Sequence, residues 1–201
     1  MQAEGRAPLS GDEPTVSLPG AAAAAVAPAE PGAPTRARRP RVALFLAVAV
    51  LVVALDQISK AIVTATLADR APIRLLGGLL TLDYTRNPGA AFSVGTGFTV
   101  VFTAVATAVV VVILRTARRL YSTAWAIALG ALLGGAVGNL VDRLARDPGF
   151  GRGHVVDWIE LPHYPVFNLA DASICCAAVA MVTLTFLGRD LDGTRHHRAN
   201  A

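Results

Sequence analysis

Four long apolar segments follow one another along the chain, and shorter polar segments separate them. They cover residues 42–63, part of 87–114, part of 120–141, and 168–187. The last three are each long enough to cross the hydrocarbon core of a bilayer as a helix, which takes about 20 apolar residues. No alternation of apolar and polar residues over about ten positions, typical of membrane β-barrels, is present in the sequence. The pattern therefore predicts an all-α membrane protein with four transmembrane helices.

The first apolar segment is short for this role. Its uncharged part, residues 42–55, has 14 residues and would form roughly 21 Å of helix, against a hydrocarbon core of about 30 Å. To cross the membrane, this helix must carry Asp56 into the membrane or its interface. An ionisable group there costs about 2.5–3.5 kcal/mol on insertion scales, so its position points to a specific role.

The composition agrees with a membrane protein and divides the chain. Hydrophobic residues make up 54% of the sequence and charged residues 16%, although residues 1–41 are rich in Ala, Pro, Gly and Arg and lack aromatic residues. The remainder is therefore too apolar for a soluble fold. We expect a disordered cytoplasmic tail over 1–40, a membrane domain over 41–188 and a cytoplasmic tail over 189–201. A secretory signal peptide, the alternative for the basic patch and first apolar segment, fits less well because further membrane segments follow.

Basic residues lie at the ends of the apolar segments. Arginines precede the first segment, separate the second from the third and follow the fourth. Ten Lys and Arg side chains from Arg36 onward lie on this side of the membrane and seven lie on the other, which places both termini in the cytoplasm by the positive-inside rule. The net charge of +4 therefore reports membrane topology, and we expect no nucleic-acid partner.

Two connections are expected on the outer side of the membrane, at 64–90 and 142–166. The first mixes β-forming residues with Gly and Pro and predicts a small extracytoplasmic sheet or β-cradle on the membrane surface. The second contains a turn-rich loop, DPGFGRG, and then VVDWIEL at 155–161, which predicts a short strand or an interfacial segment. Trp158 and Tyr164 fit the aromatic belt of a membrane interface.

Two further patterns concern packing. Gly130, Gly134 and Gly138 recur every four residues in the third segment, so they fall on one helix face and let another helix approach closely. Cys175 and Cys176 are adjacent in the fourth segment, where neighbouring side chains do not readily form a disulfide. We expect both cysteines to be small buried hydrophobic side chains.

Polar and ionisable residues gather where the apolar segments meet one membrane face. Because successive helices alternate in direction, the end of the first, the start of the second, the end of the third and the start of the fourth all lie at the outer face. The residues at these places are Asp56 and Lys60, then Asn87, then Asn139, Asp142 and Arg143, and finally Asn168 and Asp171. Asp157, in the second outer connection, is free to join them. The sequence thus predicts a polar site just inside the outer interface.

More than one chemistry fits such a site. Two carboxylates held close together cannot both ionise easily, so one keeps a proton and polarises a carbonyl while the other activates water, as in an aspartic hydrolase. A metal ion is disfavoured because Lys and Arg lie beside the carboxylates. Structural ion pairing and an ion or proton relay in a small transporter are the alternatives. Span interiors bare of charge argue against the transporter, and the clustering argues against a scaffold protein.

Five motifs, taken together, decide between these interpretations. They are DQISK at 56–60, NPGAAFS at 87–93, GGAVGNLVDR at 134–143, HVVDW at 154–158 and FNLAD at 167–171. In order and position they closely resemble the motifs of the lipoprotein signal peptidases, the bacterial type II signal peptidases, across residues 42–188. Two residues depart from the usual family pattern, since Trp158 replaces a Phe and Pro88 replaces a Thr. Neither departure affects the aspartates.

The resemblance implies an aspartic endopeptidase of the bacterial inner membrane, with its site at the outer face, that needs no cofactor and no metal. It implies diacylglyceryl-modified prolipoproteins as substrates, cleaved immediately before the lipidated Cys. Asp157 and Asp171 match the family's catalytic pair. The other matching residues, which by analogy orient this pair or contact substrate, are Asp56, Lys60, Asn87, Asn139, Asp142, Arg143 and Asn168. We expect a monomer in contact with membrane lipids.

Spacing alone also allows Asp142 to pair with Asp171. Physical reasoning favours Asp157, because the adjacent Arg143 would hold Asp142 ionised and engaged, a poor state for sharing a proton. We therefore interpret Asp142 as an anchor. Asp171 lies near the start of its helix, where the helix dipole favours the charged form, so we expect it to be the base.

Overall fold

The computed structural model describes residues 40–89 and 99–194, and the account below concerns these residues. Within them the chain forms four long helices, α1 (Val42–Leu67), α2 (Thr99–Thr116), α3 (Thr123–Ala145) and α4 (Leu169–Phe186). The strands in the same part of the chain are β1 (Ile73–Leu75), β2 (Leu80–Asn87) and β3 (Val155–Glu160). One-turn 3-10 helices lie at Leu76–Gly78 and Ala117–Arg119. The predicted N-terminal tail over 1–40 lies outside the described residues except for Pro40. Residues 90–93 of the NPGAAFS motif and residues 195–201 of the predicted C-terminal tail also lie outside them.

The helices confirm the predicted membrane architecture. Each long helix in the described part of the chain is apolar and long enough to cross a membrane, with a mean hydropathy between 1.7 and 2.4. The first helix runs on to Leu67, so it carries Asp56 and Lys60 within its length. One boundary differs from the sequence interpretation: Asn87 ends strand β2 and does not open the second helix, which begins at Thr99. Pairing of Asn87 with Val155 keeps it in the sheet.

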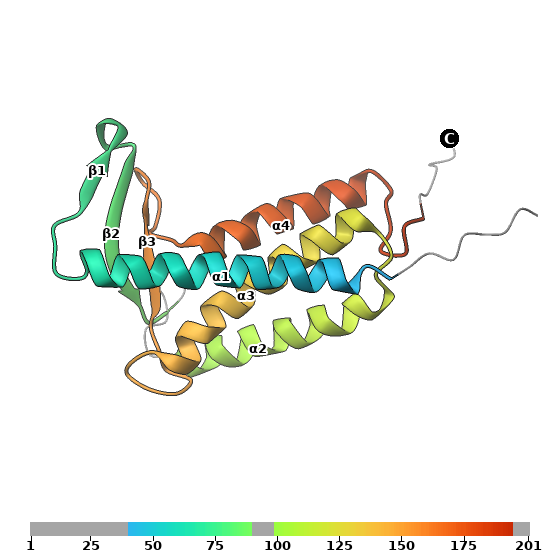
Figure 1. The fold of residues 1–201 in the computed structure, drawn as a ribbon, viewed down its shortest axis with the longest axis horizontal. Helices are drawn as coiled ribbons and strands as arrows, with labels where there is room; N and C mark the ends of the chain where they lie inside the picture. Colours follow the sequence, from blue (N-terminus) through green and yellow to red (C-terminus); the bar gives the residue numbers. More distant parts are fainter. Residues whose placement is uncertain (1–39, 90–98, 195–201) are drawn as a thin grey trace, which may run out of the picture. The chain divides into compact units, whose positions relative to one another are not determined.

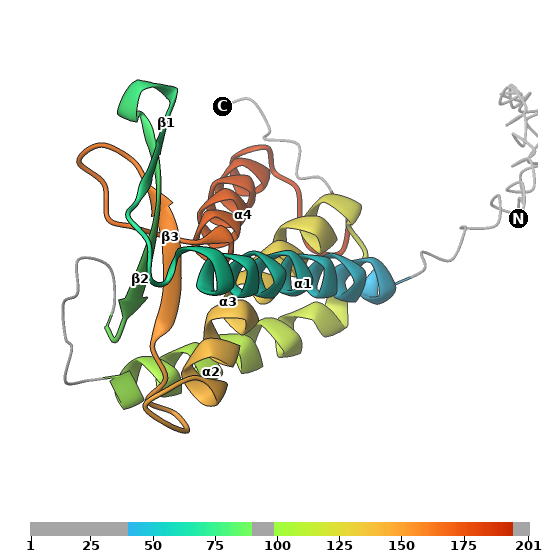
Figure 2. The same ribbon diagram turned by 60° about the vertical axis from the view of Figure 1, so that its left-hand side comes forward.

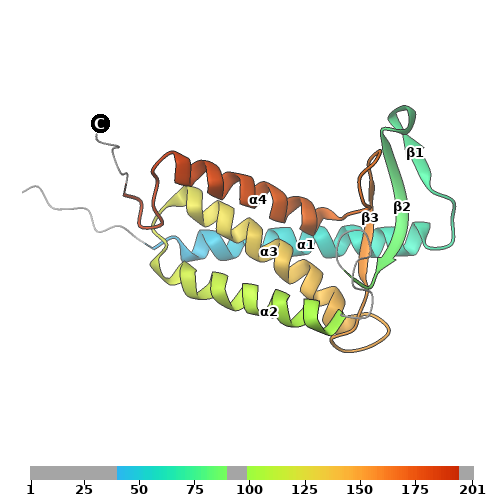
Figure 3. The same cartoon turned by 180° about the vertical axis from the view of Figure 1, so that it is seen from behind.

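Helix α3 packs against the other three helices (Figure 1). Views from the side and from behind show α2 and α4 on either side of it (Figures 2 and 3). The glycine stripe faces α1, because a Cβ added at Gly130 would lie 2.6 Å from the carbonyl oxygen of Phe45 and one at Gly134 would lie 2.6 Å from the Cβ of Val52. The predicted close approach of two helices is therefore confirmed.

The predicted cradle is a small antiparallel sheet, and the two outer connections build it together. In the described residues it has three strands in the order β1-β2-β3, and it lies at the end of the bundle where α1 ends and α4 begins (Figure 1). In the register of β2 against β3, Thr85 pairs with Asp157 and Asn87 pairs with Val155. The pairing of β2 with β3 thus brings Asn87 and Asp157 to the same region.

At the opposite end of the bundle, the chain that follows α4 is hydrogen-bonded to residues at the start of α3. The indole N–H of Trp125 donates to the carbonyl oxygen of Arg189 at 2.7 Å, and the backbone N–H groups of Tyr121 and Ser122 donate to that of Leu191. The first residues of the predicted C-terminal tail therefore pack against the start of α3.

The cysteines correct one expectation. Both Cys175 and Cys176 are exposed on the surface of α4 rather than buried. A helix that spans a membrane presents its outward face to lipid, so an apolar side chain there gains little from being covered by protein. The hydrophobic character of the segment alone did not distinguish burial inside the protein from exposure to lipid.

Candidate active site

Asp157 and Asp171 line one cavity at the junction of the sheet and the bundle. Asp157 comes from β3 and is 2% exposed, and Asp171 comes from the first turn of α4. The cavity has a volume of about 240 Å³, and Asn87, Asn139 and the two aspartates are among its lining residues. The structure thus brings together two carboxylates that lie 14 positions apart in the sequence and belong to different elements.

Asn168 holds the start of α4 and one aspartate at the same time. Its side-chain oxygen accepts a hydrogen bond from the backbone N–H of Asp171 at 2.9 Å, and the Asp171 carboxylate accepts one from the backbone N–H of Asn168. This reciprocal capping box satisfies two backbone donors that a helix start leaves without partners. It fixes the carboxylate of Asp171 at the point where the helix enters the site.

Three asparagines each aim an amide N–H at the aspartates. Asn87 and Asn168 donate to the two oxygens of Asp157, at 3.0 and 2.6 Å, and Asn139 donates to Asp171 at 2.7 Å. An N–H group can only donate hydrogen bonds, so a carboxylate facing such groups is favoured in its charged form. The amides therefore stabilise a negative charge on the pair.

The orientation of each amide is set by a donor on its other side. The side-chain oxygen of Asn87 accepts from the N–H of Gly89 at 2.9 Å, and that of Asn168 accepts from Asp171. The oxygen of Asn139 accepts from the Lys60 ammonium at 3.0 Å. A flipped amide would place its NH₂ group against another donor, so each asparagine keeps its NH₂ toward a carboxylate. The side-chain N–H of Asn168 also donates to the oxygen of Asn139, at 3.1 Å, so Asn139 is held by two side-chain donors.

A second cluster of charged groups lies beside the aspartate pair. The side chains of Asp56, Lys60 and Asp142 are fully buried, and the Lys60 ammonium lies 2.8 Å from an oxygen of each carboxylate. Arg146 binds the other oxygen of Asp142 at 2.6 Å, and Gln57 donates to both aspartates. Breaking a buried ion pair by removing one partner costs about 3–5 kcal/mol, because the other charge stays buried.

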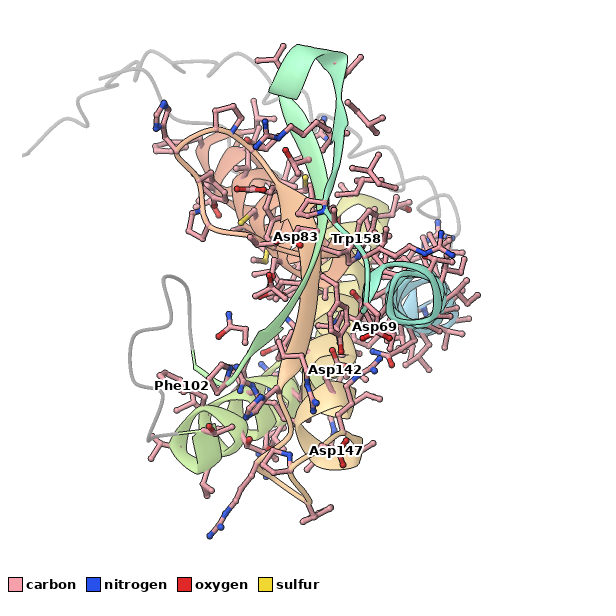
Figure 4. All side chains as sticks on the ribbon, turned by 90° about the vertical axis from the view of Figure 1, so that its left-hand side faces the viewer. Asp69, Asp83, Phe102, Asp142, Asp147 and Trp158 are labelled. Atoms are coloured by element: carbon pink, nitrogen blue, oxygen red, sulfur yellow. The ribbon has the colours of Figure 1, made fainter. Side chains whose placement is uncertain are left out.

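The charged cluster connects the helices to the elements that carry the aspartate pair. Asp56 accepts a hydrogen bond from the backbone N–H of Ala170 in the first turn of α4, at 3.0 Å. Asp142 accepts one from the N–H of Val156, next to Asp157, at 3.2 Å. Figure 4, which looks onto the sheet end, shows Asp142 on α3 close to strand β3. The cluster therefore positions both α4 and β3.

Gly138 makes room for this cluster. A Cβ at this position would lie 2.6 Å from the carboxylate of Asp56. The sequence interpretation assigned the glycine stripe to helix packing. Gly138 serves the charged cluster as well, because any side chain there would displace Asp56.

Arg143 does not engage Asp142, contrary to the sequence interpretation. It donates to the carbonyl oxygen of Gly89 at 2.7 Å, its guanidinium lies 5.8 Å from the ring centre of Phe102, and it lines the cavity. Neighbouring residues on a helix point about 100° apart, so Asp142 and Arg143 face different partners. Lys60 and Arg146 hold Asp142 instead. The buried Nη1 of Arg143 has no hydrogen-bond partner among the described residues.

The environment of Asp157 changes its acidity. Burial raises the pKa of Asp157 to about 6, and the nearby charge of Asp171 acts in the same direction. The amides of Asn87 and Asn168 favour the charged form and oppose this rise. Asp157 therefore holds a proton up to about pH 6.

Sequence reasoning placed nine residues at this site, and the structure puts all of them in the two connected clusters. It missed Gln57 and Arg146, which complete the charged cluster. Arg146 follows Asp142 by four positions, a spacing that is typical of ion pairs on a helix and could have indicated it. No pattern in the sequence indicated that Cys175 lines the cavity.

The fold and the site together define a multi-pass membrane protein with an aspartate-lined cavity at one end of its helices. The signal peptidase (SPase) II family matches residues 48–187. The chain belongs to this family, whose members are proteases.

Two curated relatives and one solved structure illustrate the similarity. The lipoprotein signal peptidase of Streptomyces coelicolor is 52% identical over 162 residues, which cover 81% of this chain and 79% of the relative. That of Mycobacterium tuberculosis strain H37Rv is 46% identical over 169 residues, or 83% of each chain. A solved structure described as a bacterial membrane enzyme superposes with a TM-score of 0.64 at 24% identity, covering 74% of this chain and 91% of that one. This last likeness supports the fold alone.

Proposed function

We propose that the protein is an aspartic endopeptidase that cleaves the signal peptide from diacylglyceryl-modified prolipoproteins immediately before the lipidated Cys. The observation that carries the proposal is the pair Asp157 and Asp171 on one cavity, with amide donors on both carboxylates. The names of the relatives support prolipoproteins as the substrate class. The reaction needs water and no cofactor.

In the proposed mechanism the two aspartates share one proton. Asp171 is the base: it takes a proton from water as the water oxygen attacks the scissile carbonyl carbon, and Asp157 donates its proton to the carbonyl oxygen. When the carbon–nitrogen bond breaks, Asp171 gives its proton to the leaving amine and Asp157 recovers a proton from the hydroxyl group. Both aspartates then return to their starting states. The pKa of Asp157 near 6 suits the acid role.

The remaining site residues take supporting roles in this proposal. The asparagines orient the aspartates, as their hydrogen bonds support, and Asp56, Lys60 and Asp142 hold α4 and β3 in place. Arg143 is the group best placed to bind a substrate carbonyl, because its Nη1 is buried at the cavity without a partner in the described part of the chain.

The proposed location and topology are inferred from the distribution of arginines along the chain. We infer a bacterial inner-membrane protein with both termini in the cytoplasm and the active site at the outer face, because arginines flank the helix ends away from the sheet. The sheet would then lie on the outer membrane surface above a membrane domain over 41–188, with tails over 1–40 and 189–201. A monomer is sufficient for this chemistry.

The first test is a cleavage assay. The purified protein in lipid nanodiscs is incubated with a diacylglyceryl-modified prolipoprotein and with the same protein before lipidation. We expect cleavage of the lipidated form only, with the lipidated Cys as the new N-terminal residue by mass spectrometry. No cleavage by folded protein, together with ion flux in proteoliposomes, would favour the transporter instead.

Proton loss from Asp157 sets the expected pH dependence. Since kcat/KM reports ionisations of the free enzyme, it should fall about tenfold per pH unit above roughly pH 6, where Asp157 loses the proton that it must donate. The folded protein also binds this proton more tightly than the unfolded chain, so thermal stability should decrease between about pH 4 and pH 6. Asp157→Asn should remove that decrease. A kcat/KM that is constant from pH 5 to 8 would contradict this assignment.

A further inference from the structure

A second cavity lies on the half of the sheet that is farther from the aspartates. It has a volume of about 460 Å³ and is formed by the hairpin of β1 and β2 together with the end of β3 and the turn that follows it. Its lining includes Arg74, Gly77, Thr81, Glu160, Leu161 and Pro162. We call this cavity the sheet groove, and we call the cavity that holds Asp157 and Asp171 the aspartate cavity.

The sheet groove opens on the face of the sheet that points away from the helices. Arg74 pairs with Thr81 and Thr81 pairs with Glu160, so these three side chains form a row on one face. Successive residues of a strand point to opposite faces, and β3 is regular here because the extra residue of the irregular pairing belongs to β2. Glu160 therefore points away from the face of Asp157, which lines the aspartate cavity together with residues of α3 and α4.

The sheet groove carries one charge of each sign. Two strand spacings of about 4.8 Å separate the backbones of Arg74 and Glu160, which are thus about 10 Å apart. In the described part of the chain neither side chain forms an ion pair. The backbone of Gly77 and Gly78 lines the groove without side chains. Such a surface suits an extended polypeptide, because Arg donates to carbonyl oxygens and Glu accepts from N–H groups. It does not suit a lipid chain, since charge is costly in hydrocarbon.

One tight turn separates the sheet groove from the aspartate cavity. Leu161 and Pro162 line the groove, whereas Tyr164 and Pro165 line the aspartate cavity. The backbone N–H of Tyr164 donates to the carbonyl oxygen of Leu161 at 3.1 Å, and His163 between them has a left-handed φ of 62°. These features define a β-turn. A polypeptide that leaves the aspartates over this turn therefore enters the groove.

We propose that the sheet groove binds the part of the substrate chain that follows the lipidated Cys, beginning at about the third to fifth residue after the cleavage site. This inference rests on the proposed function. Glu160 follows Asp157 by three positions, or about 10 Å along β3, and each residue of an extended chain spans about 3.3–3.6 Å. The polypeptide after the Cys has to leave the membrane, and the groove opens on the side away from the helices.

Substrates of two lengths test this proposal. The short one ends at the second residue after the cleavage site, and the long one continues for eight more residues. With the unchanged protein, kcat/KM should be at least fivefold higher for the long substrate, mostly through a lower KM. Arg74→Glu places two carboxylates in the groove. It should lower kcat/KM about fivefold for the long substrate and less than twofold for the short one.

Arg70→Glu is the matched control, because it makes the same change of charge at another exposed arginine. Arg70 lies between α1 and β1 and outside the groove lining. It should leave kcat/KM for both substrates within about twofold, and melting temperatures check that both variants are folded. Equal kcat/KM for the two substrates with the unchanged protein would overturn the proposal, and so would equal effects of the two variants. Failure of the unchanged protein to cleave either substrate would instead refute the proposed function.

A labelling experiment locates the substrate chain directly. A benzophenone side chain at the fourth residue after the cleavage site should crosslink to residues 72–81 or 160–162, as identified by mass spectrometry. Crosslinks confined to residues 147–153, the loop at the other end of β3 where Phe150 is exposed, would show that the chain leaves in the opposite direction and would overturn the proposal.

Discussion

Asp157→Asn and Asp171→Asn are each expected to reduce kcat/KM by roughly 10²- to 10⁴-fold, the range that a general acid or base contributes. Asparagine keeps the shape of the side chain but can neither take a proton from water nor return one. In the proposed mechanism the two aspartates act as a unit, so the double variant should be little slower than either single variant. Initial rates of prolipoprotein cleavage, with melting temperatures as a check on folding, measure this effect.

Two further aspartates serve as controls for this result. Asp83, on β2, binds the N–H of its own neighbour Tyr84 and lies outside the cavity lining, so Asp83→Asn should retain activity. Asp142→Asn should lose stability together with activity, because Asp142 holds Lys60 and the N–H of Val156. Full activity in Asp157→Asn, with complete loss in a well-folded Asp142→Asn, would reassign the pair.

Lys60→Met is the second substitution with a large expected effect, for two separable reasons. It leaves Asp56 and Asp142 without their shared cation, which should destabilise the fold by about 3–5 kcal/mol. It also removes one of the two donors that hold the amide oxygen of Asn139, the other being the side-chain N–H of Asn168. With only the Asn168 donor left, the amide is held less firmly and can more easily turn its oxygen toward Asp171, the base of the proposed mechanism. We expect kcat to fall roughly 100-fold with little change in KM.

A charge-balanced variant separates the two effects. Lys60→Met combined with Asp142→Asn removes one buried charge of each sign, so stability should recover while kcat stays low. If Lys60 acts through Asn139, then Asn139→Ala should slow the Lys60→Met protein by less than about threefold, because contacting residues are not additive. Full recovery of kcat in the charge-balanced variant would limit Lys60 to a structural role.

The hydrophobic pattern was sufficient to predict the four helices and the face on which polar residues gather. It worked because a lipid environment excludes uncompensated charge, so polar residues gather toward one end of each span. Asp171 lies in the first turn of α4, whereas Asp56 and Asn139 lie inside α1 and α3, which run on to Leu67 and Ala145. The small sheet was also predicted from its β-forming residues. Its pairing was not, because β2 and β3 lie about 70 positions apart and contacts between separate loops leave no periodic signal in either one.

The partners and the burial of individual side chains were predicted less well, because the sequence does not show which neighbour a side chain faces. Adjacency in the sequence suggested an Asp142–Arg143 pair, yet the two residues point to different sides of α3 and Lys60 from α1 takes the expected place. Similarly, the apolar surroundings of Cys175 suggested burial, whereas the structure exposes it beside the aspartates. Both differences depend on which neighbouring helix covers a given face, and the sequence of one helix does not carry that information.

The distribution of site residues over the elements also has a consequence for biogenesis. Lys60 is made with the first helix, Asn87 and Asp157 meet only when β2 pairs with β3, and Asp171 belongs to the last helix. A growing chain therefore has no complete site until its fourth span has left the ribosome and entered the bilayer. Under the proposed function, the aspartate pair is therefore complete only after α4 has been inserted.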